Sequence, residues 1–177
     1  MPDVRRKVEE DRGLLKKIQL IIPGYRGYRI REDLRDSDKI MRLELAKRLA
    51  LQRDQLEESR ADILAAMPMA KEVTALGGVI NQYKKVEGLV KYSESGYSGF
   101  VTDVRFDIDE LNRIYDYDYS VLENVQFIDE AIGVLKGAVD DEDEDKIKQS
   151  IKDVKKRLTG LEDKWEKRIA VIQGTEL

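Results

Sequence analysis

Two short glycine-rich segments share an unusual order of residue types. Residues 24–28 read Gly-Tyr-Arg-Gly-Tyr and residues 96–100 read Gly-Tyr-Ser-Gly-Phe, so both follow the pattern Gly-Tyr-x-Gly-aromatic. Glycine lets two backbones approach closely, and tyrosine combines a large apolar ring with a polar hydroxyl. The pattern therefore predicts two loops that present aromatic side chains.

Charged side chains surround these segments. Arg26 lies within the first segment, arginines follow it at positions 29, 31 and 35, and aspartates alternate with tyrosines over residues 115–119. Guanidinium and carboxylate groups form strong, charge-assisted hydrogen bonds. Arg29 and Arg31 also lie at the expected start of a long helix, where a cation is unfavourable unless an anion compensates it. Asp116 and Asp118 are the candidate anions.

Three interpretations fit this cluster. The arginines pair with carboxylates and the tyrosines stack, so that the cluster only closes one end of the fold. Alternatively, exposed Tyr and Arg form a docking surface for a protein partner or a second copy of the chain. In the third, arginines and free helix amides bind a small anion or a nucleotide, although no GxxxxGK[ST] loop is present. The candidate interaction or anion-binding residues are Tyr25, Arg26, Tyr28, Arg29, Arg31, Arg35, Tyr97, Phe100, Tyr115, Asp116 and Asp118.

The composition removes most enzyme chemistry. The chain has no cysteine and no histidine, which excludes thiolate nucleophiles, Ser-His-Asp triads and the usual zinc sites. The acidic run at residues 140–145 lacks the glycine and the spacing of a calcium loop, so we expect a solvated turn. We expect a non-enzymatic protein without a cofactor or metal. An enzyme with an Arg/Tyr/Asp site at the same cluster is the alternative.

Charge and hydropathy indicate where the protein acts. The net charge of −4 argues against nucleic-acid binding, and no apolar run resembles a signal sequence or a membrane span. We expect a cytoplasmic protein with a protein partner or a homo-oligomeric state. Contact with a membrane surface through Tyr25, Arg26 and Tyr28 is a minor alternative, because aromatic and basic side chains suit the headgroup layer.

Long helices must position the cluster. Apolar residues recur at helical spacing over five ranges, which are 4–21, about 31–66, 68 to about 90, 108 to about 139, and about 146–172. Residues 101–106 alternate like a short extended segment inside an otherwise irregular loop. The sequence thus predicts an all-α protein with one domain over residues 1–177. We expect an elongated antiparallel four-helix bundle or coiled coil with an additional N-terminal helix.

The position of one chain reversal decides whether the two loops meet. A reversal at Pro68, with this proline opening the next helix and Met69 on its apolar stripe, places both glycine-aromatic loops at the same end of the bundle. A reversal at Gly77-Gly78 is the alternative, because glycine commonly ends helices. The docking interpretation depends on the first choice.

One stretch resembles a known pattern. Residues 22–29 read Ile-Pro-Gly-Tyr-Arg-Gly-Tyr-Arg, and they are followed by Glu32, Arg35, Asp38, Lys39 and Arg42. This stretch resembles a signature of uncharacterised prokaryotic helical proteins of similar size. The resemblance implies a helical protein that is non-enzymatic or unassigned, and it supplies no catalytic residue, cofactor or partner.

Overall fold

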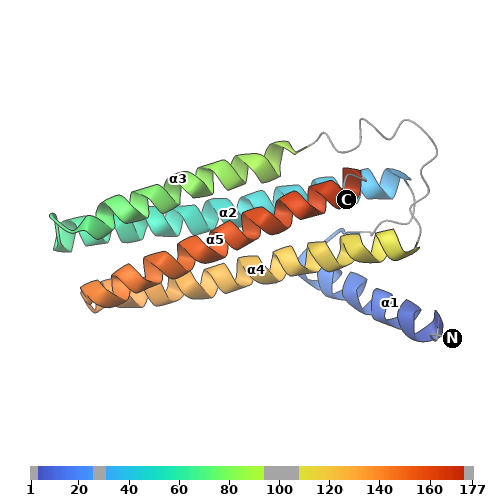
Figure 1. Ribbon diagram of the computed structural model, residues 1–177, viewed down its shortest axis with the longest axis horizontal. Helices are drawn as coiled ribbons and strands as arrows, with labels where there is room; N and C mark the ends of the chain where they lie inside the picture. The colour runs from blue at the N-terminus through green and yellow to red at the C-terminus, as the bar shows by residue number, and fades with distance from the viewer. Residues whose placement is uncertain (1–3, 26–30, 94–107, 174–177) are drawn as a thin grey trace.

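The computed structural model describes residues 4–25, 31–93 and 108–173, with side chains at 13–25, 36–93 and 112–171. These ranges contain five helices and no strand (Figure 1). The helices are α1 (Val4–Ile21), α2 (Arg31–Ala66), α3 (Lys71–Tyr92), α4 (Ile108–Asp140) and α5 (Glu144–Gln173). The all-α prediction is confirmed, while the expected extended segment at 101–106 lies outside the described residues.

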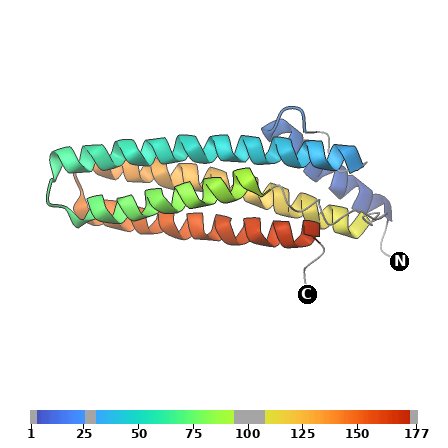
Figure 2. The ribbon, with the colours of Figure 1, turned by 90° about the horizontal axis from the view of Figure 1, so that it is seen from above.

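Four long helices form two antiparallel hairpins that pack side by side. Helices α2 and α3 make one hairpin and α4 and α5 the other, with α4 beside α2 and α3 beside α5 (Figure 2). The short helix α1 packs against α4 near the end where α2 and α4 begin (Figure 1). The predicted antiparallel four-helix bundle with an additional N-terminal helix is therefore confirmed.

Apolar stripes on the helices build the core. In α5, buried residues recur three and four positions apart, while most of the side chains between them are charged or polar. This spacing keeps one face of a helix toward the bundle axis. The stripe of α5 comprises Ile147, Ile151, Val154, Leu158, Leu161 and Trp165. Full burial of such a side chain contributes about 1.5–3 kcal/mol relative to exposure, so these stripes hold the bundle together.

The chain reverses between α2 and α3 around Pro68. Met67 N donates to Ile63 O at 2.7 Å, and Ala70 N donates to Met67 O at 3.0 Å, which forms a tight turn. Two expectations are corrected. Pro68 lies inside the turn instead of opening α3, because α3 begins only at Lys71, and Met69 is 94% exposed instead of lying on the apolar stripe. The alternative reversal is wrong, since Gly77 and Gly78 lie within α3.

The second tight connection is shorter than expected. Helix α5 begins at Glu144, inside the acidic run, so only residues 141–143 connect it to α4. Asp143 explains this start, because its Oδ1 accepts a hydrogen bond from Lys146 N at 3.0 Å as an N-cap residue does. Glu144 and Asp145 then lie in the first turn, where negative charge is favourable.

A turn after α1 directs the chain back toward the bundle. Tyr25 N donates to Ile22 O at 3.3 Å across Pro23 and Gly24, and Gly24 has a φ of +87°. Proline followed by a residue of positive φ is the arrangement of a type II turn. The turn places Tyr25 in the interior of the fold.

Candidate functional site

The candidate site lies where α3 stops short of the bundle end. Helix α3 has 22 residues and α2 has 36, so α3 covers only part of its neighbour. The last turn of α3 lies level with Arg42, whose Nη1 donates to the carbonyl oxygen of Lys91 at 3.1 Å. The ends of α1 and α3 and the beginnings of α2 and α4 gather at this end, which is called the open end below (Figure 1).

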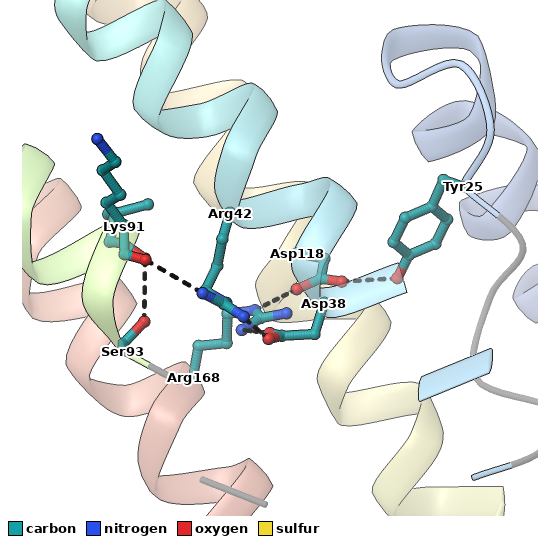
Figure 3. A network of polar contacts seen from close by, with 8 residues as sticks. Tyr25, Asp38, Arg42, Lys91, Ser93, Asp118 and Arg168 are labelled. Atoms are coloured by element: carbon teal, nitrogen blue, oxygen red, sulfur yellow. Dashed lines mark hydrogen bonds and ion pairs between the residues drawn. The ribbon is translucent and has the colours of Figure 1, made fainter. Parts of the chain in front are cut away.

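Asp118 is the first centre of a buried polar network at the open end. This α4 residue is 0% exposed, and its two carboxylate oxygens face different parts of the chain (Figure 3). Oδ2 accepts a hydrogen bond from the Tyr25 hydroxyl at 2.7 Å, and Oδ1 accepts one from Arg168 Nε of α5. Asp118 therefore joins α4 both to α5 and to the turn after α1.

Asp38 is the second centre of the network. This α2 residue is 2% exposed, and its Oδ1 accepts from Arg168 Nη1 at 2.8 Å. Its Oδ2 accepts from Arg42 Nε, also at 2.8 Å. The Arg168 guanidinium, which is itself 1% exposed, thus bridges the two aspartates, and it also lies 4.7 Å from the centroid of the Trp165 ring.

This network consists of paired charges that connect neighbouring helices. Two aspartates and two arginines cancel in formal charge, and each of the four carboxylate oxygens accepts a hydrogen bond. Burial of a charge is expensive unless a partner and hydrogen bonds compensate it, so these groups depend on one another. We call Tyr25, Asp38, Arg42, Asp118 and Arg168 the buried network. It connects α2, α4 and α5, and through Arg42 it reaches α3.

The candidate residues named from the sequence fall into four groups. Tyr25, Tyr115 and Asp118 are buried, and Tyr25 and Asp118 are in direct contact. Asp116 is exposed on α4. Arg31 and Arg35 belong to the first turns of α2, where side chains are not described, and the remaining candidates lie outside the described residues. These are Arg26, Tyr28, Arg29, Tyr97 and Phe100.

Three members of the buried network are missing from the sequence-derived set: Asp38, Arg42 and Arg168. A signal for two of them exists in the spacing. Arg168 continues the apolar stripe of α5, three residues after Trp165, and Asp38 lies three residues before the buried Met41. A charged residue at a core position of a helical repeat indicates an interior partner of opposite charge. Asp38 and Arg42 also belong to the stretch that carries the resemblance.

A second buried polar contact set lies nearer the middle of the bundle. Gln52 Nε2 donates to Val125 O at 2.9 Å and to Asp129 Oδ1 at 2.7 Å, and the Tyr83 hydroxyl donates to Gln52 Oε1 at 3.2 Å. Burial raises the pKa of the Tyr83 hydroxyl well above its ordinary value, and the charge of Asp129 raises it further. These residues tie α2, α3 and α4 together and are not part of the open end.

Neither a metal centre nor a membrane span is found in the described part of the chain. Within residues 4–25, 31–93 and 108–173, no three acidic side chains are grouped so that they could hold a metal ion. Among the same residues, no helix combines the length and the apolar character needed to cross a bilayer.

Comparison with known proteins adds no relative. No protein-family model, no curated protein and no solved structure matches this chain. The fold defines the class, an all-α protein of four long antiparallel helices with a short N-terminal helix packed against them. A functional proposal must therefore start from the contacts at the open end.

Proposed function

We propose that this chain is a non-enzymatic interaction or scaffold protein that binds a protein partner, or a second copy of itself, through the open end. The observation that supports this proposal is the complete pairing of both buried aspartates. Both oxygens of Asp38 and of Asp118 accept hydrogen bonds from groups that hold helices in place. A general acid or base must instead reach a proton on a substrate, so these carboxylates suit a structural role.

A rigid open end favours binding by the segments attached to it. Binding residues often lie on loops that a rigid scaffold positions. The buried network fixes α2, α4 and α5 at the level where α3 ends. The chain that follows Tyr25 and the chain that follows Ser93 both leave the described residues at this end. The partner-contacting residues of the proposal lie in and directly after the two glycine-aromatic segments, and they are Arg26, Tyr28, Arg29, Tyr97 and Phe100.

An exposed aromatic residue at the open end also supports the proposal. Tyr92, in the last turn of α3, is 71% exposed, and the Lys91 ammonium lies 5.4 Å from the centroid of its ring. Tyrosine is enriched among the residues that dominate binding energy at protein interfaces. Both described arginines of the network pair with carboxylates, which favours a protein surface over an anion site.

Photo-crosslinking from the two ends of the bundle tests this proposal. A benzoyl-phenylalanine replaces Tyr92 at the open end or, as the control, Met69 at the opposite turn, where the side chain is even more exposed. We expect an adduct of defined mass from position 92 and none from position 69. Adducts of the same identity and yield from both positions contradict a specific open-end surface.

Charge removal in the first glycine-aromatic segment completes the experiment. Substitution of Arg26 and Arg29 by alanine is expected to abolish the adduct from position 92 while the melting temperature changes little. The control variant replaces Lys71 and Lys148, which are exposed near the opposite end, by alanine and therefore removes the same charge. If the Arg26 and Arg29 substitutions lower the melting temperature strongly and leave the adduct intact, these arginines support the fold and do not bind a partner.

A further inference from the structure

We propose that Asp118 couples the docking of α1 to the packing of α2, α3 and α5 at the open end. In this proposal α1 acts as a strap on the four-helix bundle. The strap is defined as α1 together with the turn that ends at Tyr25. The proposal concerns a conformational device within the fold, and it holds or fails independently of any partner at the open end.

The strap is held by apolar and polar contacts of its C-terminal half. Ile18 and Ile22 are fully buried against the bundle. The Lys17 ammonium lies 5.1 Å from the centroid of the Tyr119 ring on α4. Arg48 Nη2 of α2 donates to Ile21 O at 3.2 Å, at the helix end where a cation is favourable.

The strap is the element with the fewest supports. Among the described residues, each of the four long helices packs substantially against at least two others, whereas α1 packs substantially only on α4. Elements with little packing open at lower free energy than the core of a domain. Undocking of α1 is therefore the expected first opening event among the described helices.

One carboxylate connects this event to the rest of the open end. Gln19 Nε2 donates to Tyr25 O at 3.0 Å, which ties α1 to the residue that reaches Asp118. Undocking withdraws the Tyr25 hydroxyl and leaves Asp118 Oδ2 without that donor, while Oδ1 still binds Arg168. Members of a buried network polarise one another, so loss of one donor weakens the next bond.

Hydrogen bonds connect Asp118 to each of the other long helices. From Asp118 the path passes through Arg168 to Asp38, on to Arg42, and ends at the carbonyl oxygen of Lys91 in α3 (Figure 3). Release of the strap is thus transmitted to α5, α2 and α3 by contacts that the structure shows. A merely adjacent helix without the Tyr25 contact would lack this path.

Hydrogen exchange of the full chain tests the coupling with two variants. Ile18→Ala loosens the strap without altering a group of the buried network, and Tyr25→Phe removes the hydroxyl that donates to Asp118. We expect either variant to speed exchange in α1 and also in the turn of α5 around Arg168, by about 10- to 100-fold for Tyr25→Phe, as expected for loss of a hydrogen bond to a charged group. Exchange over residues 144–158, at the other end of α5, should not change.

A double variant and a control substitution on α4 show whether the coupling runs through the Tyr25 hydroxyl. In the Tyr25→Phe background, Ile18→Ala should speed exchange in α1 further but add nothing around Arg168, because the link is already cut. Tyr119→Phe deletes the hydroxyl of the α4 ring that Lys17 contacts and leaves Asp118 in place, and it should leave α5 unchanged. Faster exchange confined to α1, or spread evenly along α5, overturns the proposal. If Ile18→Ala does not fold, the Tyr25→Phe and Tyr119→Phe comparison decides alone.

Discussion

Asp38 and Asp118 are carboxylates in the interior of a helical bundle, where an unpaired charge would cost several kcal/mol. Arg42 pairs with Asp38 within α2, whereas Arg168 reaches both aspartates only when the helices have one relative position. Arg168 must lie level with Asp118 on α4 and with Asp38 on α2 at the same time. Buried ion pairs often add little net stability compared with apolar side chains, so the main effect we infer here is selection of helix register.

Tyr83 provides a prediction about alkaline pH. Its pKa is raised in the folded protein by burial and by Asp129, whereas in the unfolded chain it is about 10. The stability that depends on the neutral hydroxyl is therefore complete below about pH 10 and is lost above it, by about 1.4 kcal/mol per pH unit. Urea unfolding between pH 9 and 11.5 should show a shallower decline for Tyr83→Phe. Tyr92→Phe, at an exposed position, should decline as the parent does, and equal slopes for all three proteins would contradict the assignment.

At the residue scale, the sequence predicts part of the site. Tyr25 and Asp118 are found from the repeated glycine-aromatic pattern and the alternation of tyrosine with aspartate. Arg168 is not, because it is one of many basic residues on α5 and only its place in the apolar stripe distinguishes it. The pairing of Arg168 with two aspartates also joins residues 50 and 130 positions apart, a relation that no local pattern contains.

At the scale of the elements, the helices follow directly from apolar spacing and helix breakers. The bounds of α2 agree with the prediction because Pro68 blocks continuation of the helix. The starts of α3 and α5 differ from expectation by a few residues, since backbone hydrogen bonds extend the turn to Ala70 and the Asp143 cap starts α5 early. Such contacts depend on turn geometry, which residue types restrict only loosely.

Two glycines should respond in opposite directions to the same substitution. Gly133 lies on the exposed side of α4, where an added Cβ meets no atom within 4 Å, so Gly133→Ala should stabilise the protein by about 0.5–1 kcal/mol. At Gly24 an added Cβ also has space, but the φ of +87° strains any other residue. Gly24→Ala should therefore destabilise by about 1 kcal/mol. Chemical denaturation measures both, and changes of the same sign would contradict the described turn.

At the scale of the whole molecule, the reversal at residues 67–70 places the open end and this turn at opposite ends of α3. The chain has no cysteine, so Met69→Cys and Tyr92→Cys introduce unique sites for spin labels on two exposed side chains. The backbone separation should be roughly 30–35 Å, from 1.5 Å per helical residue. A reversal at Gly77-Gly78 would instead give about 15 Å. Dipolar spectroscopy separates these values.

The buried network holds the helices together at the open end. A double-mutant cycle between Asp118 and Arg168 tests this role most directly. Asp118→Asn and Arg168→Met should each destabilise the protein by about 3–5 kcal/mol, because each takes one charged partner away from a buried charge. The double variant should be at least about 2 kcal/mol more stable than the sum of the single effects implies. The partly exposed pair Asp153 and Arg157, whose Oδ2 and Nε atoms lie 2.8 Å apart, is the control and should show a coupling below about 1 kcal/mol. Effects of Asp118 and Arg168 that add to within about 0.5 kcal/mol would contradict the account.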